Sequence, residues 1–177
     1  MLMRIIKYCC KYLKMKKDPV GYARSLGVRV GNKTRVLGME IGTFGSEPYL
    51  VSLGDNVSVT SGVKFITHDG GMWVLRNEFP AIDIIAPIRV GNNVFIGMDS
   101  IIMPGVTIGD NCVIGAGSLV SRDIPPGTVA AGVPAKPLKT VEEYRAKALE
   151  NSIETYLMSP EEKKKYLLNR FYPQAGR

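Results

Sequence analysis

Aliphatic residues recur at every sixth position along the middle of the chain. The stretch 90–125 divides into the blocks VGNNVF, IGMDSI, IMPGVT, IGDNCV, IGAGSL and VSRDIP. Each block opens with Val or Ile, and its fifth place holds a small or branched side chain. A second similarity has a period of eighteen residues, since VGNNVF pairs with IGDNCV and IGMDSI pairs with IGAGSL. Self-similarity of this kind predicts a repeat architecture.

The six-residue spacing has a simple physical explanation. Neighbouring side chains of a strand point to opposite faces, so the opening aliphatic points inward and the next residue outward. Gly or Asn then tolerates the positive φ of a tight corner. Three strands and three corners return the chain above its starting point. The pattern therefore predicts an all-β solenoid of hexapeptide repeats, in which each coil stacks on the last.

The solenoid pattern does not cover the whole chain. Similar blocks begin at 30, 53, 59 and 65, whereas two stretches break the register and are expected to be loops, at 37–52 and 70–87. We expect three regions: an N-terminal helical cap at 1–27, the solenoid at 28–139 and a C-terminal helical extension at 140–177.

Helix signals mark both ends of the chain. Asp18 and Pro19 start a short turn, Thr140 with Glu143 makes a capping box, and SPEE at 159–162 is a strong helix start. Terminal helices would cover the strand edges and the apolar interior that an open solenoid end exposes.

Residues 2–17 are basic and apolar at once, with six cations and no acid. The apolar residues that roughly share one helical face are Leu2, Ile5, Ile6, Cys9 and Leu13. Two interpretations are open. The favoured one is a cap whose basic face lies in water; the other is weak peripheral association of residues 1–17 with an anionic membrane.

The net charge of +7 and the pI of about 9.4 favour an anionic partner such as a phosphate-bearing cofactor. Nucleic acid is not expected, because the basic charge lies at the ends without interleaved aromatics. A hydrophobic fraction of 45% is ample for a packed core. No stretch has the length of a membrane span or an uninterrupted signal-peptide core, so we expect a cytoplasmic protein.

Cysteine and histidine are too sparse for a disulfide framework or a metal site. The three cysteines form no Cys-x-x-Cys pair, and a single histidine excludes a histidine-rich metal site within one chain. Cys112 fills the fifth place of its hexad and is expected to be a buried small residue, not a nucleophile. Cys9 and Cys10 are expected to pack in the N-terminal helix.

The hexads, the segment IGAGSLVSRDIPPGTVAAGVPAKPLK at 114–139 and the lone histidine in THDGG resemble the left-handed β-helix acyltransferases. Within that family the chain is similar to sugar O-acetyltransferases of the galactoside, maltose and nodulation type, and closer to those of surface-polysaccharide synthesis. The resemblance covers roughly residues 28–140, and hexads followed by AAGVPAK are its most specific part. It implies acetyl-CoA as donor and a homotrimer with active sites between subunits.

The resemblance also implies roles for individual positions. His68 matches the catalytic histidine. The positions expected to border the acetyl-CoA groove are Gly97, Met98, Ala116, Ser121 and Arg122, with Lys136 and Lys139 just beyond. Arg122 and the two lysines would face the phosphates of CoA. The loop 70–87 differs from the galactoside type, so the identity of the acceptor does not carry over.

Acetyl transfer from a thioester to a hydroxyl needs a base, donors for the oxyanion and two substrates held in attack geometry. Neutral imidazole suits the first task near pH 7, so we assign His68 as general base in a direct transfer without metal or acyl-enzyme. Backbone N–H groups near Gly97 and Met98 are candidate oxyanion donors. A structural loop histidine is the alternative that the resemblance disfavours.

The group that orients His68 stays open at this point. The nearby carboxylates are Asp69, Glu78 and Asp83, and a backbone carbonyl would serve as well. Glu47 is a candidate for binding acceptor hydroxyls or a solvated loop acid. Trp73 and Phe79 would either stack on a sugar or anchor the loop to a neighbouring subunit.

The leading function is an acetyl-CoA-dependent O-acetyltransferase that acts on a sugar or polysaccharide precursor. An N-acetyltransferase for an amino-sugar or antibiotic-like amine would use the same base and groove. A non-catalytic trimeric scaffold is the alternative of another class, against which His68 and AAGVPAK argue. Metal-dependent hydration on a related solenoid would require three histidine ligands, and the chain has one.

Overall fold

The structure is a computed structural model that describes residues 2–173, and within the first helix the side chains of residues 3, 8 and 11–17. The chain forms two compact units, Met1–Tyr144 and Arg145–Arg177. No helix within residues 2–173 is long and apolar enough to cross a membrane.

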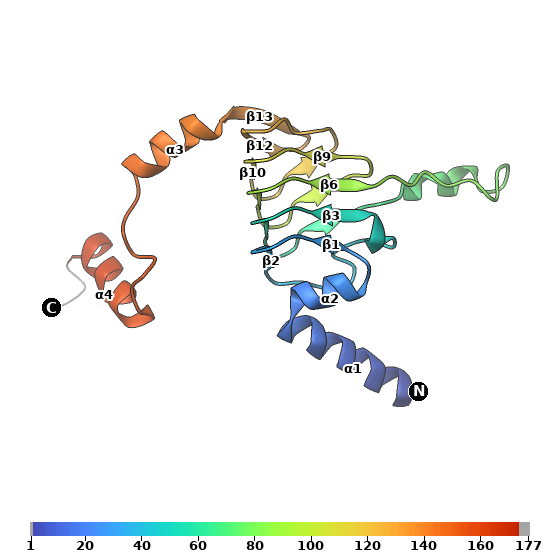
Figure 1. The fold of residues 1–177 in the computed structure, drawn as a ribbon, viewed down its shortest axis with the longest axis horizontal. Coiled ribbons are helices and arrows are strands. Elements are labelled where there is room, and N and C mark those ends of the chain that lie inside the picture. The colour runs from blue at the N-terminus through green and yellow to red at the C-terminus, as the bar shows by residue number, and fades with distance from the viewer. Residues whose placement is uncertain (1, 174–177) are drawn as a thin grey trace. The chain divides into compact units, whose positions relative to one another are not determined.

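Two helices precede the strands and lie at the end of the coil stack that holds β1 and β2 (Figure 1). They are α1 (Leu2–Lys17) and α2 (Pro19–Ser25). Pro19 opens α2 with a preset φ, and the Gly21 N–H donates to Asp18 Oδ1 at 2.8 Å. Tyr22 and Ala23 of α2 are buried in the core, so this helix covers apolar surface at the first coil.

Short strands then wind through three sheets, which the chain visits in turn (Figure 1); every pair of neighbouring strands except the last is parallel. The four-stranded sheet has the order β1 (Arg29–Val30), β3 (Val51–Leu53), β6 (Ile88–Val90), β9 (Thr107–Ile108). The three-stranded sheet consists of β5 (Lys64–Phe65), β8 (Ile101–Ile102) and β11 (Leu119–Val120). The six-stranded sheet is formed by β2 (Arg35–Val36), β4 (Ser58–Val59), β7 (Phe95–Ile96), β10 (Val113–Ile114), β12 (Thr128–Gly132) and β13 (Ala135–Thr140).

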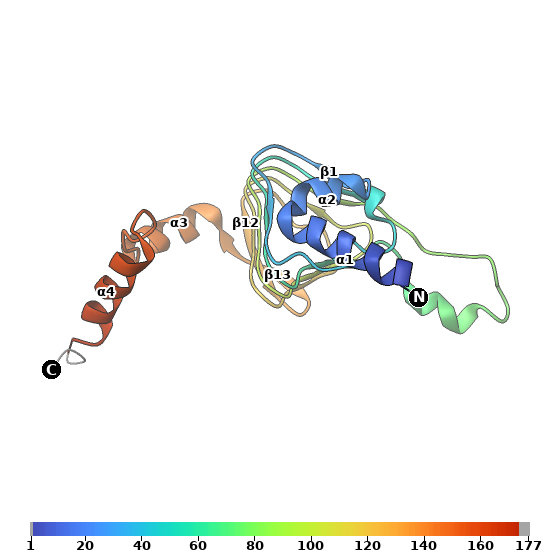
Figure 2. The same ribbon diagram turned by 90° about the horizontal axis from the view of Figure 1, so that it is seen from below.

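Successive coils lie directly over one another, as Figure 2 shows. Ile114 is the parallel partner of Ile96, and the amides of Asn93 and Asn111 bond across 18 residues. One coil lower, the amides of Asn56 and Asn93 bond across 37 residues, because the loop at 70–87 is inserted between them. The predicted stack of short parallel strands is therefore present, while its left-handed winding stays a prediction.

The interior is filled by the two positions of each hexad that the pattern assigned to it. The first-place residues are at most 5% exposed: Val90, Ile96, Ile102, Ile108, Ile114 and Val120. The fifth-place residues are at most 3% exposed: Val94, Ser100, Val106, Cys112, Ser118 and Ile124. Each buried aliphatic contributes roughly 1.5–3 kcal/mol, so the repeat itself stabilises the coil.

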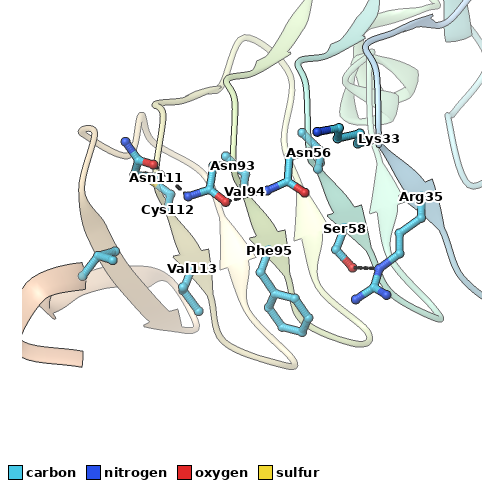
Figure 3. Close-up of a pocket in the computed structure, with 12 residues that line it drawn as sticks. Lys33, Arg35, Asn56, Ser58, Asn93, Val94, Phe95, Asn111, Cys112 and Val113 are labelled. Carbon is cyan, nitrogen blue, oxygen red and sulfur yellow. Dashed lines mark hydrogen bonds between the residues drawn. The ribbon is translucent and has the colours of Figure 1, made fainter. Parts of the chain in front are cut away.

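One corner of the coil is formed by asparagines in the left-handed region. Asn56, Asn93 and Asn111 have φ of 54°, 54° and 55° and form a ladder of amide hydrogen bonds of 2.8 Å between successive coils (Figure 3). Asn tolerates this conformation better than most residues, which explains its recurrence before the fifth place. Lys33 takes the same φ of 54° at the first coil.

The last coil ends in a hairpin that the hexapeptide pattern did not predict. β13 folds back antiparallel on β12 and forms the edge of the six-stranded sheet. The predicted helix starts are confirmed. The Thr140–Glu143 box precedes α3 (Val141–Glu150), and Ser159 caps α4 (Pro160–Phe171) with Glu162 in the reciprocal position.

Ile114→Ala tests the contribution of the inward positions. We expect it to lower the free energy of unfolding by about 2–5 kcal/mol, because the fully buried side chain leaves a cavity between two coils. The matched control is Ile84→Ala, where the isoleucine is 51% exposed and the change should stay within about 0.5 kcal/mol. Equal effects in denaturant titrations would contradict the assignment of these positions to the core.

Candidate active site

His68 lies at the corner where the three-stranded sheet gives way to the four-stranded sheet, between β5 and β6. The loop that follows it begins with a short 3₁₀ helix, η2 (Gly70–Leu75), and projects from the stack (Figure 1). Its two ends are paired at the base. The Asp69 N–H donates to Ile84 O at 2.9 Å and the Ala86 N–H donates to Thr67 O at 3.0 Å. These bonds fix the backbone on both sides of His68.

A second loop, between β2 and β3, folds over β5 and reaches the same corner. The Phe65 N–H donates to Thr43 O at 2.8 Å, and the rings of Phe44 and Phe65 stack with centroids 5.2 Å apart. Gly45 then turns the chain with a φ of 65°, and a Cβ there would lie 2.7 Å from Phe65 O. Only glycine satisfies both conditions. This turn brings Glu47, just before η1 (Pro48–Leu50), alongside His68.

The central contact joins the imidazole to this glutamate. Glu47 Oε2 is 3.2 Å from His68 Nδ1, and the same oxygen accepts a hydrogen bond of 2.6 Å from Thr67 Oγ1. The side chains of His68 and Glu47 are 42% and 18% exposed. The Thr67 hydroxyl, assisted by His68, holds the pKa of Glu47 below its ordinary value against a partial burial that would raise it. The carboxylate is therefore ionised at neutral pH, so it accepts a hydrogen bond from the Nδ1–H of His68.

A cavity of about 260 Å³ opens beside the two side chains, between the two loops. Trp73, which is 80% exposed, lines it together with Met72 and Arg76. Arg76 is held in place by an ion pair with Asp83 and by hydrogen bonds to Pro80 O at 3.1 Å and Ile82 O at 2.6 Å. An aromatic ring, a cation and carboxylates around a half-exposed imidazole can bind a polyhydroxylated molecule.

The carboxylates nearest to His68 in sequence have other partners. Asp69 accepts a hydrogen bond from the Gly71 N–H at 2.8 Å at the start of η2, and Asp83 pairs with Arg76. Glu78 is exposed on the loop and is not among the residues that line the cavity. The acid that contacts the imidazole is Glu47, which the sequence suggested for a different task. No local pattern indicated this contact, because it joins positions 21 residues apart. Thr67 belongs to the THDGG motif but was given no role, and Arg76 was not singled out.

The residues expected to border the acetyl-CoA groove occupy three places in the chain. Met98 and Ala116 lie one above the other at the corner between the six-stranded and three-stranded sheets, and the Gly117 N–H donates to Met98 O at 2.7 Å. Ser121 and Arg122 follow β11 and are exposed at the corner of His68, two coils further along. Lys136 and Lys139 belong to β13. Within one chain, Met98 and His68 are therefore at different corners.

Gly97 and Met98 differ as candidate donors to an oxyanion. The Gly97 N–H already donates to Ile114 O at 2.8 Å, and a Cβ at Gly97 would lie 2.5 Å from Ala116 N. Gly97 thus allows the coils to approach closely. In the described residues no protein acceptor is assigned to the Met98 N–H, and its side chain is 53% exposed. Of the two, Met98 keeps the available donor.

A larger hollow, of about 420 Å³, lies over the outer face of the six-stranded sheet (Figure 3). Its walls include Lys33, Phe95 and Val113 besides the asparagine ladder, and Arg35 Nε donates to Ser58 Oγ at 3.0 Å. It contains no histidine and no carboxylate. Of these two cavities, the smaller one next to His68 is the one lined by a histidine and by carboxylates.

Comparison with known proteins decides the family. The bacterial transferase hexapeptide family, with six repeats, matches residues 87–122. Protein CapG of Staphylococcus aureus is 55% identical over 148 residues, which make up 84% of this chain and 86% of CapG. The chain belongs to the hexapeptide-repeat transferases.

Other members of the family are named for sugar acetylation. The galactoside O-acetyltransferase of Escherichia coli (strain K12) is 45% identical over 98 residues, 55% of this chain and 47% of that protein. A galactoside acetyltransferase solved in complex with coenzyme A has a TM-score of 0.55 at 35% identity, covering 68% of this chain and 58% of that one. The chain spans about half the length of these enzymes. The predicted resemblance to sugar O-acetyltransferases and the class of acyltransferase are confirmed.

Cys112 has the burial expected of a core position in a hexapeptide-repeat transferase. It is 1% exposed, and its Sγ donates to Pro125 O at 3.1 Å. Burial raises the pKa of the Cys112 thiol, so little thiolate forms at neutral pH. The side chains of the other two cysteines, Cys9 and Cys10, lie outside the described residues.

Alkylation of the native protein tests this position. At pH 8 we expect iodoacetamide to modify Cys112 much more slowly than in urea-unfolded protein, because the raised pKa and the burial both suppress the thiolate. Peptide mass mapping separates Cys112 from the two N-terminal cysteines. Cys112→Ala should retain acetyl transfer. Fast alkylation of the native protein with loss of activity would instead support Cys112 as a nucleophile.

Proposed function

We propose that this chain transfers the acetyl group of acetyl-CoA to a hydroxyl of a sugar or polysaccharide precursor. The observation that carries the proposal is one half-exposed imidazole, 3.2 Å from an ionised carboxylate, at the edge of a cavity. Family membership supplies the reaction class. Coenzyme A in a related galactoside acetyltransferase supports acetyl-CoA as donor.

Glu47 acts as the positioning residue of the base. Its carboxylate accepts a hydrogen bond from Nδ1–H, which leaves the lone pair of His68 on Nε2. Nε2 takes the proton of the acceptor hydroxyl while its oxygen attacks the thioester carbonyl. The tetrahedral intermediate then collapses, the C–S bond breaks, and the proton on Nε2 passes to the departing CoA sulfur. The ring is neutral again after each turnover, and no acyl-enzyme is needed.

The oxyanion site comes from a neighbouring subunit in this proposal. His68 and Met98 occupy different corners of the coil, so a single chain does not complete the site. A homotrimer places the corner of Met98 and Ala116 in one subunit against the corner of His68 in the next. The Met98 N–H then faces the developing negative charge. The left-handed winding belongs to the same proposal.

The acceptor binds between the two loops. Trp73 offers an aromatic face to a sugar ring, and Arg76 and Asp83 offer a fixed donor and acceptor for hydroxyl groups. The loop residues Glu78 and Phe79 lie outside this cavity lining. We assign Glu47 to His68, which removes it from direct binding of acceptor hydroxyls.

Release of free thiol from acetyl-CoA, followed while nucleotide sugars, free sugars and glycans are screened, tests this function. With the best acceptor, His68→Ala should lower kcat by about 10²–10⁴-fold, since the base is lost. Glu47→Ala should lower kcat by about 10- to 100-fold, the equivalent of one hydrogen bond to a charged group.

Glu47→Gln separates the effect of the negative charge of Glu47 from the effect of its hydrogen bond to His68. The amide oxygen still accepts from Nδ1–H but carries no charge, so the low-pH limb of the kcat profile should move to lower pH. Asp69→Asn, at a carboxylate engaged with Gly71, is the matched control and should leave that limb in place. Near-normal transfer by His68→Ala at saturating substrates would refute the general base.

The lysines of β13 are tested separately. Lys136→Ala should raise the KM for acetyl-CoA by about tenfold, the loss of one charge-assisted hydrogen bond to a CoA phosphate of about 1.5 kcal/mol. Lys139→Ala should act in the same direction. The KM of the acceptor should not change, and Lys163→Ala on α4 serves as control. Equal damage to donor and acceptor KM would contradict this placement of the phosphates.

A further inference from the structure

The first helix carries a concentration of positive charge that the proposed reaction does not use. The segment LMRIIKYCCKYLKMKK of α1 contains six Lys or Arg residues and no acid. The lysines whose side chains are described, Lys11, Lys14, Lys16 and Lys17, are all exposed. A helix of this composition is attracted to anionic surfaces and repelled by cationic ones.

Apolar and aromatic side chains of the same helix face water. Leu13 is 66% exposed, Met3 73%, Tyr8 59% and Tyr12 45%. Met15, by contrast, enters the core, at 1% exposure. Leu13 and Met15 are two positions apart, about 200° around a helix, so they point to nearly opposite sides. Among the side chains of α1 that the structure describes, Met15 makes the contact with the core, and Leu13 does not.

The sequence extends the apolar pattern of Leu13 towards the N-terminus. Positions 2, 5, 6 and 9 are apolar and have the helical spacing of one face with position 13. The interpretation of α1 as a cap that buries this face therefore does not hold for Leu13. The apolar interior at this end is covered by Tyr22 and Ala23 of α2.

We propose that α1 docks on an anionic membrane surface. Leu13 and the positions at its spacing enter the acyl boundary, and the flanking lysines contact lipid phosphates. Tyr12 suits the headgroup level, where amphipathic rings concentrate, and Lys16 Nζ lies 5.4 Å from the Tyr12 ring centroid. Exposed leucine and methionine favour lipid over nucleic acid, because nucleic acid offers no apolar phase in which these side chains could be buried. This inference does not depend on the proposed acetyl transfer.

Flotation of the full chain with lipid vesicles tests the proposal. We expect binding to vesicles that contain phosphatidylglycerol and none to pure phosphatidylcholine, because the charges lack counterparts there. Raising the salt from 0.1 to 1 M should weaken binding strongly, since the Debye length falls from about 10 to about 3 Å. Equal binding to both vesicles, or none to either, would overturn the proposal.

Matched lysine variants locate the surface. Lys14→Gln, Lys16→Gln and Lys17→Gln together should weaken vesicle binding by about 100-fold, at about fivefold for each cation. Lys163→Gln, Lys164→Gln and Lys165→Gln on α4 make the same change in net charge and should have little effect. Leu13→Gln should weaken binding by about tenfold without changing the charge. Equal loss in both triple variants would show a general charge effect and contradict a docking helix.

Two other occupants of the α1 surface give distinct results. A variant of Leu13 that alters the oligomeric mass in light scattering would assign the surface to a second copy of the chain. Binding to RNA without binding to anionic vesicles would assign it to nucleic acid. Either result would overturn the proposal. Circular dichroism confirms that each variant is folded, and acetyl transfer by the lysine variants should equal that of the unmodified chain.

Discussion

The fold depends on one packing constraint, the stacking of each inward aliphatic on its counterpart in the next coil. Ile96 can lie between its counterparts in the two adjacent coils only if every coil returns to the same place. The length of each side of the coil is therefore fixed. Fixed sides require tight corners, and tight corners place residues in the left-handed region, which Gly and Asn tolerate best and which Lys33 and Asp99 adopt as well. Those corners are also where His68 and Met98 are found. The core therefore decides where chemistry is possible, although no core residue takes part in it.

The solenoid could be predicted because its stabilising contacts are periodic in the sequence. First and fifth places of the hexads, from Val90 to Ile124, are buried as the pattern requires. The position of His68 beside an inserted loop followed from the same pattern, since the register breaks at 70–87. The β12–β13 hairpin escaped prediction because its pairing is antiparallel and follows the last regular block, where periodicity gives no information. Cap chemistry, by contrast, is local, and Ser159 and Thr140 start helices as expected.

The carboxylate that contacts His68 could not be predicted for a physical reason. Candidate acids were sought near His68 in sequence, but Asp69 is turned to the backbone of η2 and Asp83 to Arg76. Glu47 reaches the ring because Phe44 stacks on Phe65 and Gly45 permits a turn too close for any other residue. Each of these contacts is tertiary and occurs once. A repeat shows itself in sequence by recurrence, and an arrangement that occurs once leaves no such trace.

The paired base of the long loop has a consequence for the evolution of such enzymes. Hydrogen bonds on either side of His68 join residues 67 and 69 to residues 86 and 84, and the imidazole is oriented from a different loop altogether. The tip between them can lengthen, shorten or change composition while His68 and Glu47 keep their contact. Under the proposed function, a different acceptor would then require changes in the tip of this loop alone, and the pairing of imidazole and carboxylate would be inherited unchanged.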